Sequence, residues 1–266
     1  MDARTDDLSN EDVLLREDAD GVTRLTLNRP DKYNAMSEDL VERLHATLKE
    51  LAQDPACRVI VLAAAGDKAF CPGHDLKEMI EANDHAFYEE AFRRSAALTK
   101  TMISMPQPIV ARVQGLTTAG GCQIVAACDM AIASSAATFS ANGITNGLFC
   151  AMPSVTISRN VPRKQAFNML FTGAFIDAAQ AQEIGLVNKV VEPEELDTAV
   201  AEVTAAIRAK PATAVARGKE VFYQQLQMPL SEALDFTAGW MAEDMDSDTA
   251  REGVNAFIEK RKPVWD

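Results

Sequence analysis

Two glycine-bearing turns carry the residue types and spacing that can do chemistry in this chain. The first is the segment Phe70-Cys-Pro-Gly-His-Asp-Leu-Lys-Glu-Met79, and the second is the pair Gly120-Gly121. Each follows a short apolar run, at residues 59–62 and 109–113. Glycines at a strand-to-helix turn let backbone N–H groups face a cleft, and the helix dipole adds positive potential there. Two such turns that converge on one oxygen form an oxyanion hole without a charged residue.

The elements around these turns indicate an α/β fold. Ser37 is the expected N-cap of a helix with an apolar stripe, and residues 84–105 are typical of a long helix. The continuous apolar run at 59–62 is typical of a strand that is covered on both faces. Short apolar runs predict strands at residues 13–16, 22–27, 59–62, 109–113 and 129–133. Alternation of strands and helices predicts an α/β protein.

The C-terminal part of the chain differs from the rest because its strand signals end near residue 195. Helices are expected at residues 196–210, 212–227, 230–245 and 249–260. We therefore expect two regions. Residues 1–194 form a core that holds the site, and residues 195–266 form a helical region that packs on the core or on a neighbouring subunit.

Several other catalytic motifs are missing from the sequence. No G-x-G-x-x-G follows a strand, and neither G-x-x-x-x-G-K-[ST] nor G-x-S-x-G occurs. The chain has 3 histidines, and its 5 cysteines form no C-x-x-C pair. These counts exclude a His-rich metal site and disfavour a disulfide framework. We expect neither a metal nor a permanently bound cofactor.

The charge balance and the apolar patterning narrow the partners and the location. The 266 residues include 26 Lys and Arg against 39 Asp and Glu, a net charge of −13, which disfavours a nucleic-acid partner. Residues 1–7 are acidic and lack the apolar segment of a secretory signal. No apolar stretch reaches the ~20 residues that a membrane span needs. The sequence therefore predicts a cytoplasmic protein without a membrane span.

A set of motifs gives the chain a resemblance to a known family. The motifs are Leu27-Asn-Arg-Pro-Asp-Lys-Tyr-Asn-Ala-Met36, the first glycine turn, and Gly115 with Gly120-Gly-Cys-Gln123. Together they resemble the crotonase (enoyl-CoA hydratase/isomerase) superfamily, and the ending Glu252-Gly-Val-Asn-Ala-Phe-Ile-Glu-Lys-Arg-Lys262 is similar to its C-terminal signature. The segments at residues 146–150, 161–164 and 169–173 resemble the subgroup that contains enoyl-CoA hydratase domain-containing protein 3.

This resemblance implies a fold and a site. The fold would be a spiral of ββα units whose C-terminal helices mediate homotrimers, often stacked as hexamers. The substrate would be an acyl-CoA thioester, with coenzyme A entering only as part of the substrate. Its carbonyl oxygen would be held by the backbone N–H groups of His74 and Gly120.

The departures from the family pattern concern the acid and base of hydration. A glutamate follows the Gly-Gly-Cys turn in the hydratases, and the resemblance places Gln123 there. The second catalytic glutamate falls on Gly143. Gln123 can orient a water but cannot accept its proton, and Gly143 has no side chain. The sequence therefore disfavours hydration by the two-glutamate mechanism.

The resemblance also implies contacts with the CoA thioester. Lys32 and Tyr33 would border the adenine and ribose, and Lys77 would approach the phosphates. Asn142 and Cys150 would line the pocket, although a structural role is an equal reading for both. The full set of expected binding residues is Lys32, Tyr33, Asp75, Leu76, Lys77, Asn142, Cys150, Phe257 and Lys260. For the lysines, the alternative is a solvated surface charge of little energetic value.

Three functional hypotheses remain open. The leading one is an enzyme that acts on acyl-CoA or enoyl-CoA thioesters by stabilising an enolate. It would be classed with the enoyl-CoA hydratases, which are lyases of fatty acid metabolism. A second is decarboxylation of a malonyl-type thioester with His74 in the site, because a Gly-His-Asp turn also occurs in decarboxylases of this superfamily. Those relatives also use a tyrosine, whose position here is Cys150. A third is a non-catalytic acyl-CoA-binding protein. Gly143→Glu combined with Gln123→Glu should create hydratase activity if the scaffold already poses an enoyl thioester.

Overall fold

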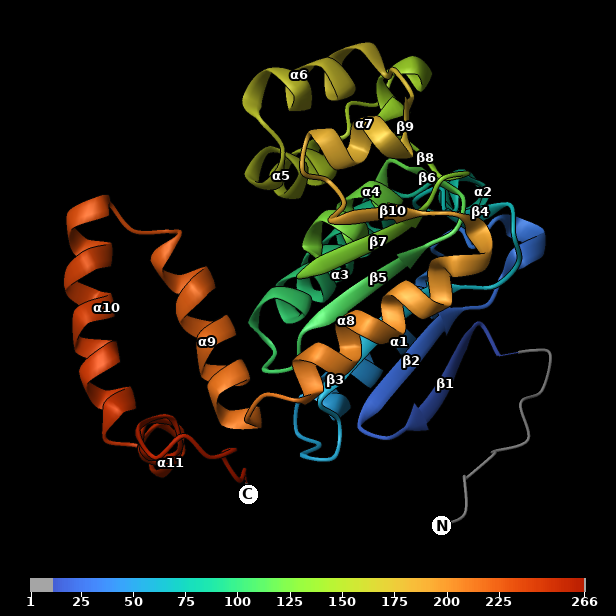
Figure 1. Ribbon diagram of the computed structural model, residues 1–266. Helices are drawn as coiled ribbons and strands as arrows, with labels where there is room; N and C mark the ends of the chain where they lie inside the picture. Colours follow the sequence, from blue (N-terminus) through green and yellow to red (C-terminus); the bar gives the residue numbers. More distant parts are fainter. Residues whose placement is uncertain (1–11, 266) are drawn as a thin grey trace.

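The computed structural model describes residues 12–265, and its core contains two β-sheets flanked by helices (Figure 1). The larger sheet has the strand order β1–β2–β3–β5–β7–β10. Its strands are β1 (Leu14–Ala19), β2 (Val22–Leu27), β3 (Val59–Ala64), β5 (Ile109–Val113), β7 (Met130–Ser134) and β10 (Lys189–Val191). Only the β1–β2 pair is antiparallel among the pairs of this sheet. Every residue of β3 is buried, as its apolar run predicts.

The second sheet is built from very short strands and produces the spiral. Its order is β4–β6–β8–β9, with β4 (Ala69–Cys71), β6 (Leu116–Thr118), β8 (Thr138–Ser140) and β9 (Ile176–Asp177). Along the chain, β3 is followed by β4 and a helix, and β5 by β6 and a helix. Each turn of the chain thus places one strand in each sheet before a helix begins. The expected spiral of ββα units is confirmed.

Helices cover both faces of the larger sheet. On one side lie α1 (Glu38–Leu51), α3 (His85–Ser104) and α4 (Gly120–Ala127), which share the main apolar core with the strands. Ser37 caps α1 by accepting a hydrogen bond from the N–H of Leu40, as the sequence predicts. On the other side α8 (Leu196–Arg208) packs against β3, β5 and β7 (Figure 1). The expected boundary at residue 194 stays a prediction. The helix just after it, α8, packs on the larger sheet and is part of the core.

The core contains further helices and single 3-10 turns, of which α5, α6 and α7 lie together at the top of Figure 1. They are η1 (Pro30–Lys32), α2 (Leu76–Ala82), η2 (Asn142–Asn146), α5 (Ala151–Asn160), α6 (Arg163–Thr172), α7 (Ala178–Glu183) and η3 (Pro193–Glu195). The strand and helix patterns did not predict these elements, nor any of the strands β4, β6, β8, β9 and β10. Strands of two or three residues are too short to show a periodicity, and helices of six or seven residues show little more. The helices α5 and α6 have 10 residues each but bury only 3 residues each, so their apolar stripes are weak.

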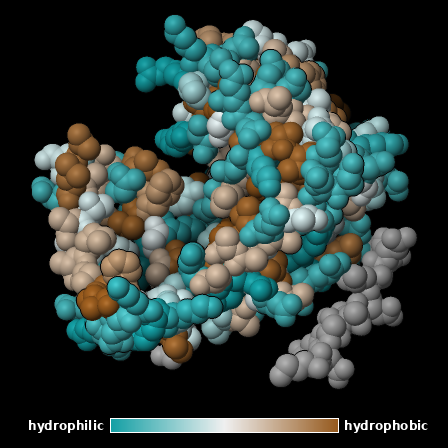
Figure 2. All heavy atoms as spheres, viewed as in Figure 1, coloured by the Kyte–Doolittle hydropathy of each residue, from teal (hydrophilic) through white to brown (hydrophobic). Residues whose placement is uncertain are grey.

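Three C-terminal helices form an arm that extends from the core. They are α9 (Ala212–Gln225), α10 (Leu230–Met245) and α11 (Asp248–Ile258), close to the predicted ranges (Figure 1). Hydrophobic surface is visible over the arm, on the left in Figure 2. The exposed apolar side chains of the arm include Phe222, Leu226, Leu230, Leu234, Met241 and Met245. Exposed apolar area of this extent is typical of a surface that another protein covers.

One buried ammonium joins this arm to the core. The Lys219 Nζ on α9 donates to the carbonyl oxygens of Met102 and Gln107 and to the Asp129 carboxylate, at 2.8, 2.9 and 2.8 Å. Tyr223 donates its hydroxyl to the other oxygen of Asp129 at 2.9 Å. Burial lowers the pKa of Lys219, and the neighbouring Asp129 charge opposes that shift. Every proton of the ammonium has a partner, which is the condition for a buried charge to be stable.

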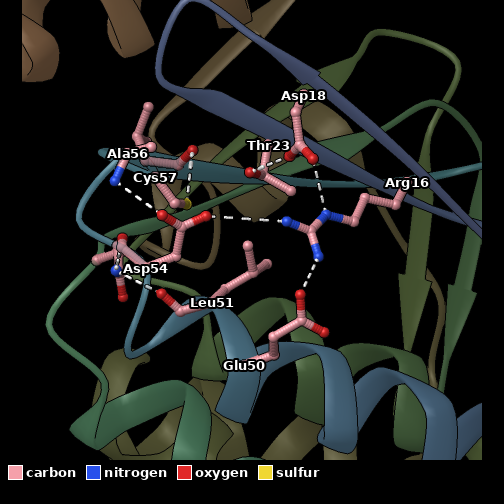
Figure 3. Close-up of polar contacts among 10 residues, drawn as sticks. Arg16, Asp18, Thr23, Glu50, Leu51, Asp54, Ala56 and Cys57 are labelled. Atoms are coloured by element: carbon pink, nitrogen blue, oxygen red, sulfur yellow. Dashed lines mark hydrogen bonds and ion pairs between the residues drawn. The ribbon is translucent and has the colours of Figure 1, made fainter. Parts of the chain in front are cut away.

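At the other end of the sheet, a polar cluster ties the first hairpin to α1 (Figure 3). The Arg16 guanidinium on β1 contacts the carboxylates of Asp18 and Glu50 at 2.9 and 2.7 Å. Thr23 on β2 donates to Asp18 at 2.6 Å. Because these groups are partly exposed, they fix the orientation of the hairpin more than they contribute to stability.

Among the described helices, none is long and apolar enough to span a membrane.

Candidate active site at the two glycine turns

The first turn, at residues 72–75, is fixed by the hydrogen bonds of its own backbone. The Gly73 carbonyl accepts from the N–H of Met36 at 2.8 Å, and the N–H of Asp75 donates to the Met36 carbonyl at 2.9 Å. Thr118 donates its hydroxyl to the Pro72 carbonyl at 2.9 Å. Gly73 has a φ of +107°, which glycine adopts without strain. Within the described part of the chain, the N–H of His74 has no acceptor, so it is the free donor of this turn.

The second turn, at residues 119–121, holds a strained residue and a very close approach. Ala119 precedes α4 with φ 44° and ψ −113°, a combination that costs energy for a residue with a Cβ. The backbone of Gly121 passes very close to β4. A Cβ on Gly121 would lie 2.0 Å from the Cys71 carbonyl oxygen. Strain and close approach at one turn indicate a function that requires this backbone path.

The two turns meet, as the sequence predicts. A Cβ on Gly73 would lie 2.9 Å from the Gly120 nitrogen, so the two backbones are in contact. Among residues 12–265, neither the His74 N–H nor the Gly120 N–H donates a hydrogen bond to another group. Gly120 is also the first residue of α4, where the helix leaves its N–H groups unpaired. Two free donors, of which the Gly120 N–H lies at a helix N-terminus, can bind one oxygen anion.

The His74 ring stands beside this donor pair and is neutral. It packs edge-on against Phe92 of α3, with ring centroids 5.3 Å apart. Burial lowers the pKa of His74 to about 4. Its Nε2 is buried and has no hydrogen-bond partner among the described residues. At neutral pH the ring therefore contributes a neutral imidazole and no charge.

Gln123 is buried and occupies the same helix as Gly120. The residue is 2% exposed, and its Nε2 donates to the Thr99 hydroxyl of α3 at 2.9 Å. Its Oε1 is buried and has no partner within the described part of the chain. No sequence pattern pointed to Thr99, because only the packing of α3 against α4 brings it to Gln123.

Gly143 lies in a confined loop. Its N–H donates to the Cys150 Sγ at 3.3 Å, and burial raises the pKa of that thiol. A Cβ on Gly143 would come within 2.5 Å of the Leu148 carbonyl oxygen and 2.7 Å of the Cys150 Sγ. The loop has therefore closed over the position where the resemblance places the second glutamate. The expectation that Gly143→Glu tests the pose of the substrate needs correction, because the backbone must move before any side chain fits.

The expected CoA contacts on the first turn are held together by one ion pair. Arg29 contacts the Asp75 carboxylate at 2.9 Å, and Asp75 also accepts from the Lys77 N–H. Burial raises the pKa of Asp75. The hydrogen bond and charge of Arg29, together with the N–H groups of Lys77 and Glu78, lower the pKa by more, so it lies below its ordinary value. Asp75 thus positions the loop. Lys32, Tyr33, Leu76 and Lys77 are exposed, and Asn142 is half-buried at the start of η2.

Comparison with known proteins decides the family. The model of the family described as enoyl-CoA hydratase/isomerase matches residues 17–266. This chain belongs to that family. It is 40% identical to enoyl-CoA hydratase domain-containing protein 3 of Xenopus laevis, over 92% of this chain and 83% of that protein. The resemblance to that subgroup is confirmed.

Solved structures of family members support the same fold. An enoyl-CoA hydratase of Mycobacterium smegmatis superposes with a TM-score of 0.93 at 46% identity, covering 96% of this chain and 99% of that one. The human enoyl-CoA hydratase domain-containing protein 3 gives 0.92 at 36% identity, over 96% and 100%. The crotonase fold is therefore shown.

In this family member, two expected CoA contacts lie away from the turns. Phe257 and Lys260 belong to α11 and to the residues just after it, and both are exposed. Figure 1 shows α11 on the opposite side of the core from α2 and β4. Within one chain, the structure does not bring these two residues to His74 and Gly120.

The expected location needs correction. Relatives similar to this chain over 92% of its length, from Xenopus laevis and Homo sapiens, are named mitochondrial proteins. This contradicts the cytoplasmic prediction. That prediction rested on the lack of a secretory segment, of a membrane span and of disulfides, and none of these separates the cytoplasm from a mitochondrial interior. The acidic segment at residues 1–7 lies outside the described residues.

Proposed function

We propose that this chain binds an acyl-CoA thioester with the carbonyl oxygen between the N–H groups of His74 and Gly120, and that it stabilises the enolate of that thioester. The contact between the Gly73 and Gly120 backbones supports this proposal most directly, since it puts two unpaired donors side by side. Loss of one donor from such a hole typically costs about 10²–10³ in rate.

Hydration by two carboxylates has no support in the residues around this hole. Gln123 cannot act as a base, and the loop at Gly143 is closed. His74, with a pKa of about 4, is a poor base at neutral pH. The proposed chemistry is therefore restricted to enolate stabilisation without water activation by a carboxylate pair.

Decarboxylation of a malonyl-type thioester is a second candidate, favoured by one observation. The His74 ring is neutral beside the donor pair, and its Nε2 is buried. A carboxylate held in such surroundings is poorly solvated, and loss of CO₂ leaves an enolate that the two N–H groups stabilise. The step needs no base, because the C–C bond supplies the electron pair of the enolate.

Assembly into trimers or a dimer of trimers is part of the proposal. The exposed apolar side chains of the arm support it, because a monomer would leave them in water. A neighbouring arm is also the remaining way for Phe257 and Lys260 to approach the thioester site.

Calorimetry and spectroscopy on the full chain test the proposed function. We expect butyryl-CoA and crotonyl-CoA to bind, and the conjugated-thioester absorbance of crotonyl-CoA to persist. Release of CO₂ from methylmalonyl-CoA or malonyl-CoA would identify the decarboxylase, and binding without any turnover would identify a binding protein. Rapid loss of the crotonyl absorbance would show hydration without two carboxylates. If no thioester binds, the proposal is wrong.

A further inference from the structure

Met36 contacts both glycine turns of the candidate site, and its backbone holds the first. It forms a one-residue parallel bridge with His74. The Gly73 carbonyl accepts from the Met36 N–H at 2.8 Å, and the Asp75 N–H donates to the Met36 carbonyl at 2.9 Å. Both bonds are thus made by the residues on either side of His74. The His74 N–H itself stays free among residues 12–265, in a position that Met36 determines.

The side chain of Met36 reaches the second turn. A Cβ on Gly120 would lie 2.5 Å from the Met36 Cε and 3.5 Å from the His74 Nδ1. The terminal methyl group of Met36 therefore occupies the space that a side chain on Gly120 would take. Met36 is 3% exposed, so it brings a nearly dry apolar surface to the Gly120 backbone. One residue thus contacts both donors, the first through its backbone and the second through its side chain.

A buried amide holds the turn that leads into Met36. Asn34 has a φ of +62°, a left-handed conformation that is uncommon for a residue with a Cβ. Its Oδ1 accepts from the Arg29 N–H at 2.9 Å. Its Nδ2 donates to the carbonyl oxygens of Ala65 and Ala69, each at 2.9 Å. Because Ala69 begins β4, the backbone before Met36 is tied to the strand that leads into the first turn.

We propose that Met36 is a positioning residue for the oxyanion hole. Its backbone aims the His74 N–H, and its methyl group packs on Gly120 and keeps water from that side of the donor pair. The inference rests on the proposed function and goes beyond it by naming the residue that joins the two donors. Such donors stabilise an oxyanion far more strongly where water is excluded. Without the methyl group, water could enter beside Gly120, because the N–H groups and the His74 Nδ1 offer it polar partners.

The test uses two ligands that differ in their use of the donors. Acetoacetyl-CoA forms an enolate with its own near-ultraviolet absorbance, and S-butyl-CoA is a thioether without a carbonyl oxygen. We expect the unchanged chain to raise the enolate-to-keto ratio of bound acetoacetyl-CoA above that of the free ligand. Met36→Ala should lower this ratio about tenfold, because the donors lose aim and gain water. Calorimetry should show a nearly unchanged affinity for S-butyl-CoA, which does not use the donors.

Two further variants keep the test decisive if Met36→Ala unfolds. Met36→Leu conserves the apolar volume, an exchange that protein cores tolerate well. Its side chain ends one atom before the position of the Met36 Cε, so the enolate-to-keto ratio should fall here too. Met169→Ala in α6 is the matched control, since Met169 is 1% exposed and belongs to the same apolar core. It loses the same side chain and should leave the ratio unchanged.

The outcomes separate this inference from the proposed function. An unchanged ratio in both Met36 variants overturns the inference and leaves the proposed function standing. An equal fall in Met169→Ala also overturns it, because any loss of core packing would then be sufficient. So does a matching loss of affinity for S-butyl-CoA, which would show general damage to the binding site. If the unchanged chain does not raise the enolate-to-keto ratio, the oxyanion hole is wrong and both fall together.

Discussion

The backbone at Gly121 lies against the carbonyl of Cys71 so closely that a Cβ would come within 2.0 Å of the oxygen. This contact joins α4 to β4 and thereby sets the distance between the two donors. Since the obstacle is backbone, it cannot move aside as a flexible side chain does. The distance between the two donors therefore depends on position 121, where only glycine fits.

Gly121→Ala should separate the two turns and disable the site. We expect thioester turnover, or binding if the chain has no turnover, to fall by about 10² or more, because at least one donor loses its aim. Calorimetry together with circular dichroism checks this. Gly218→Ala in α9 is the matched control, since a Cβ there meets nothing within 4 Å. Equal binding by Gly121→Ala and the unchanged chain would contradict the assigned hole.

Gly143→Glu should destabilise the chain instead of creating a hydratase, even when combined with Gln123→Glu. The added Cβ meets the Leu148 carbonyl and the Cys150 sulfur, and overpacking of this kind costs roughly 1–3 kcal/mol. The measurements are the unfolding midpoint in urea and the rate of loss of crotonyl-CoA absorbance. Gly239→Glu on α10, where the space is open, is the control. A variant at Gly143 that is stable and hydrates crotonyl-CoA would disprove this expectation.

Lys219→Met should weaken the attachment of the arm to the core. It leaves the Asp129 carboxylate without its buried counter-charge, which typically costs about 3–5 kcal/mol. Tyr223→Phe removes one hydrogen bond to the same carboxylate and should cost less, about 1–2 kcal/mol. Chemical unfolding at a fixed protomer concentration measures both. Lys164→Met, at an exposed site on α6, should change the free energy of unfolding by less than about 0.5 kcal/mol. Equal effects of Lys219→Met and Lys164→Met would refute the anchoring role.

The burial of His74 should make stability fall as the solution is acidified. The pKa of the ring is lowered from 6.5 to about 4 in the fold, so between these pH values the unfolded chain binds a proton that the folded chain does not. Stability therefore rises with pH through this window, by up to about 3 kcal/mol in total.

Urea unfolding at pH 7 and pH 5 checks this linkage. His74→Gln should make the loss of stability between the two pH values about 2 kcal/mol smaller than in the unchanged chain. His85→Gln, at an exposed position in the first turn of α3, is the control and should leave the loss unchanged. An identical pH dependence for His74→Gln and the unchanged chain would show that the ring is not buried as a neutral group.

Much of the fold was predictable because its long elements carry strong periodic signals. The Ser37 cap and the stripe of α1, the buried run of β3 and the four C-terminal helices were all predicted. The small sheet was not, because its strands contain two or three residues each. Such strands are defined by the neighbours with which they pair, and not by their own pattern.

The candidate site was predictable only in its backbone. The sequence placed two glycine turns after adjacent strands, and the structure brings them together. The partner of Gln123 could not be predicted, because Thr99 reaches it through the packing of two helices. The closed loop at Gly143 and the distance of Phe257 from the turns were also beyond the sequence, since both depend on how distant segments lie in space.

Helix α3 belongs to both the candidate site and the attachment of the arm. Its Phe92 and Thr99 contact His74 and Gln123, and near its C-terminal end the Met102 carbonyl accepts from Lys219. Opening of this helix breaks both sets of contacts in one event, so the site and the arm belong to one cooperative unit. A ligand that holds the site closed must therefore also slow the release of the arm, and an assembly that holds the arm must in turn keep the site intact.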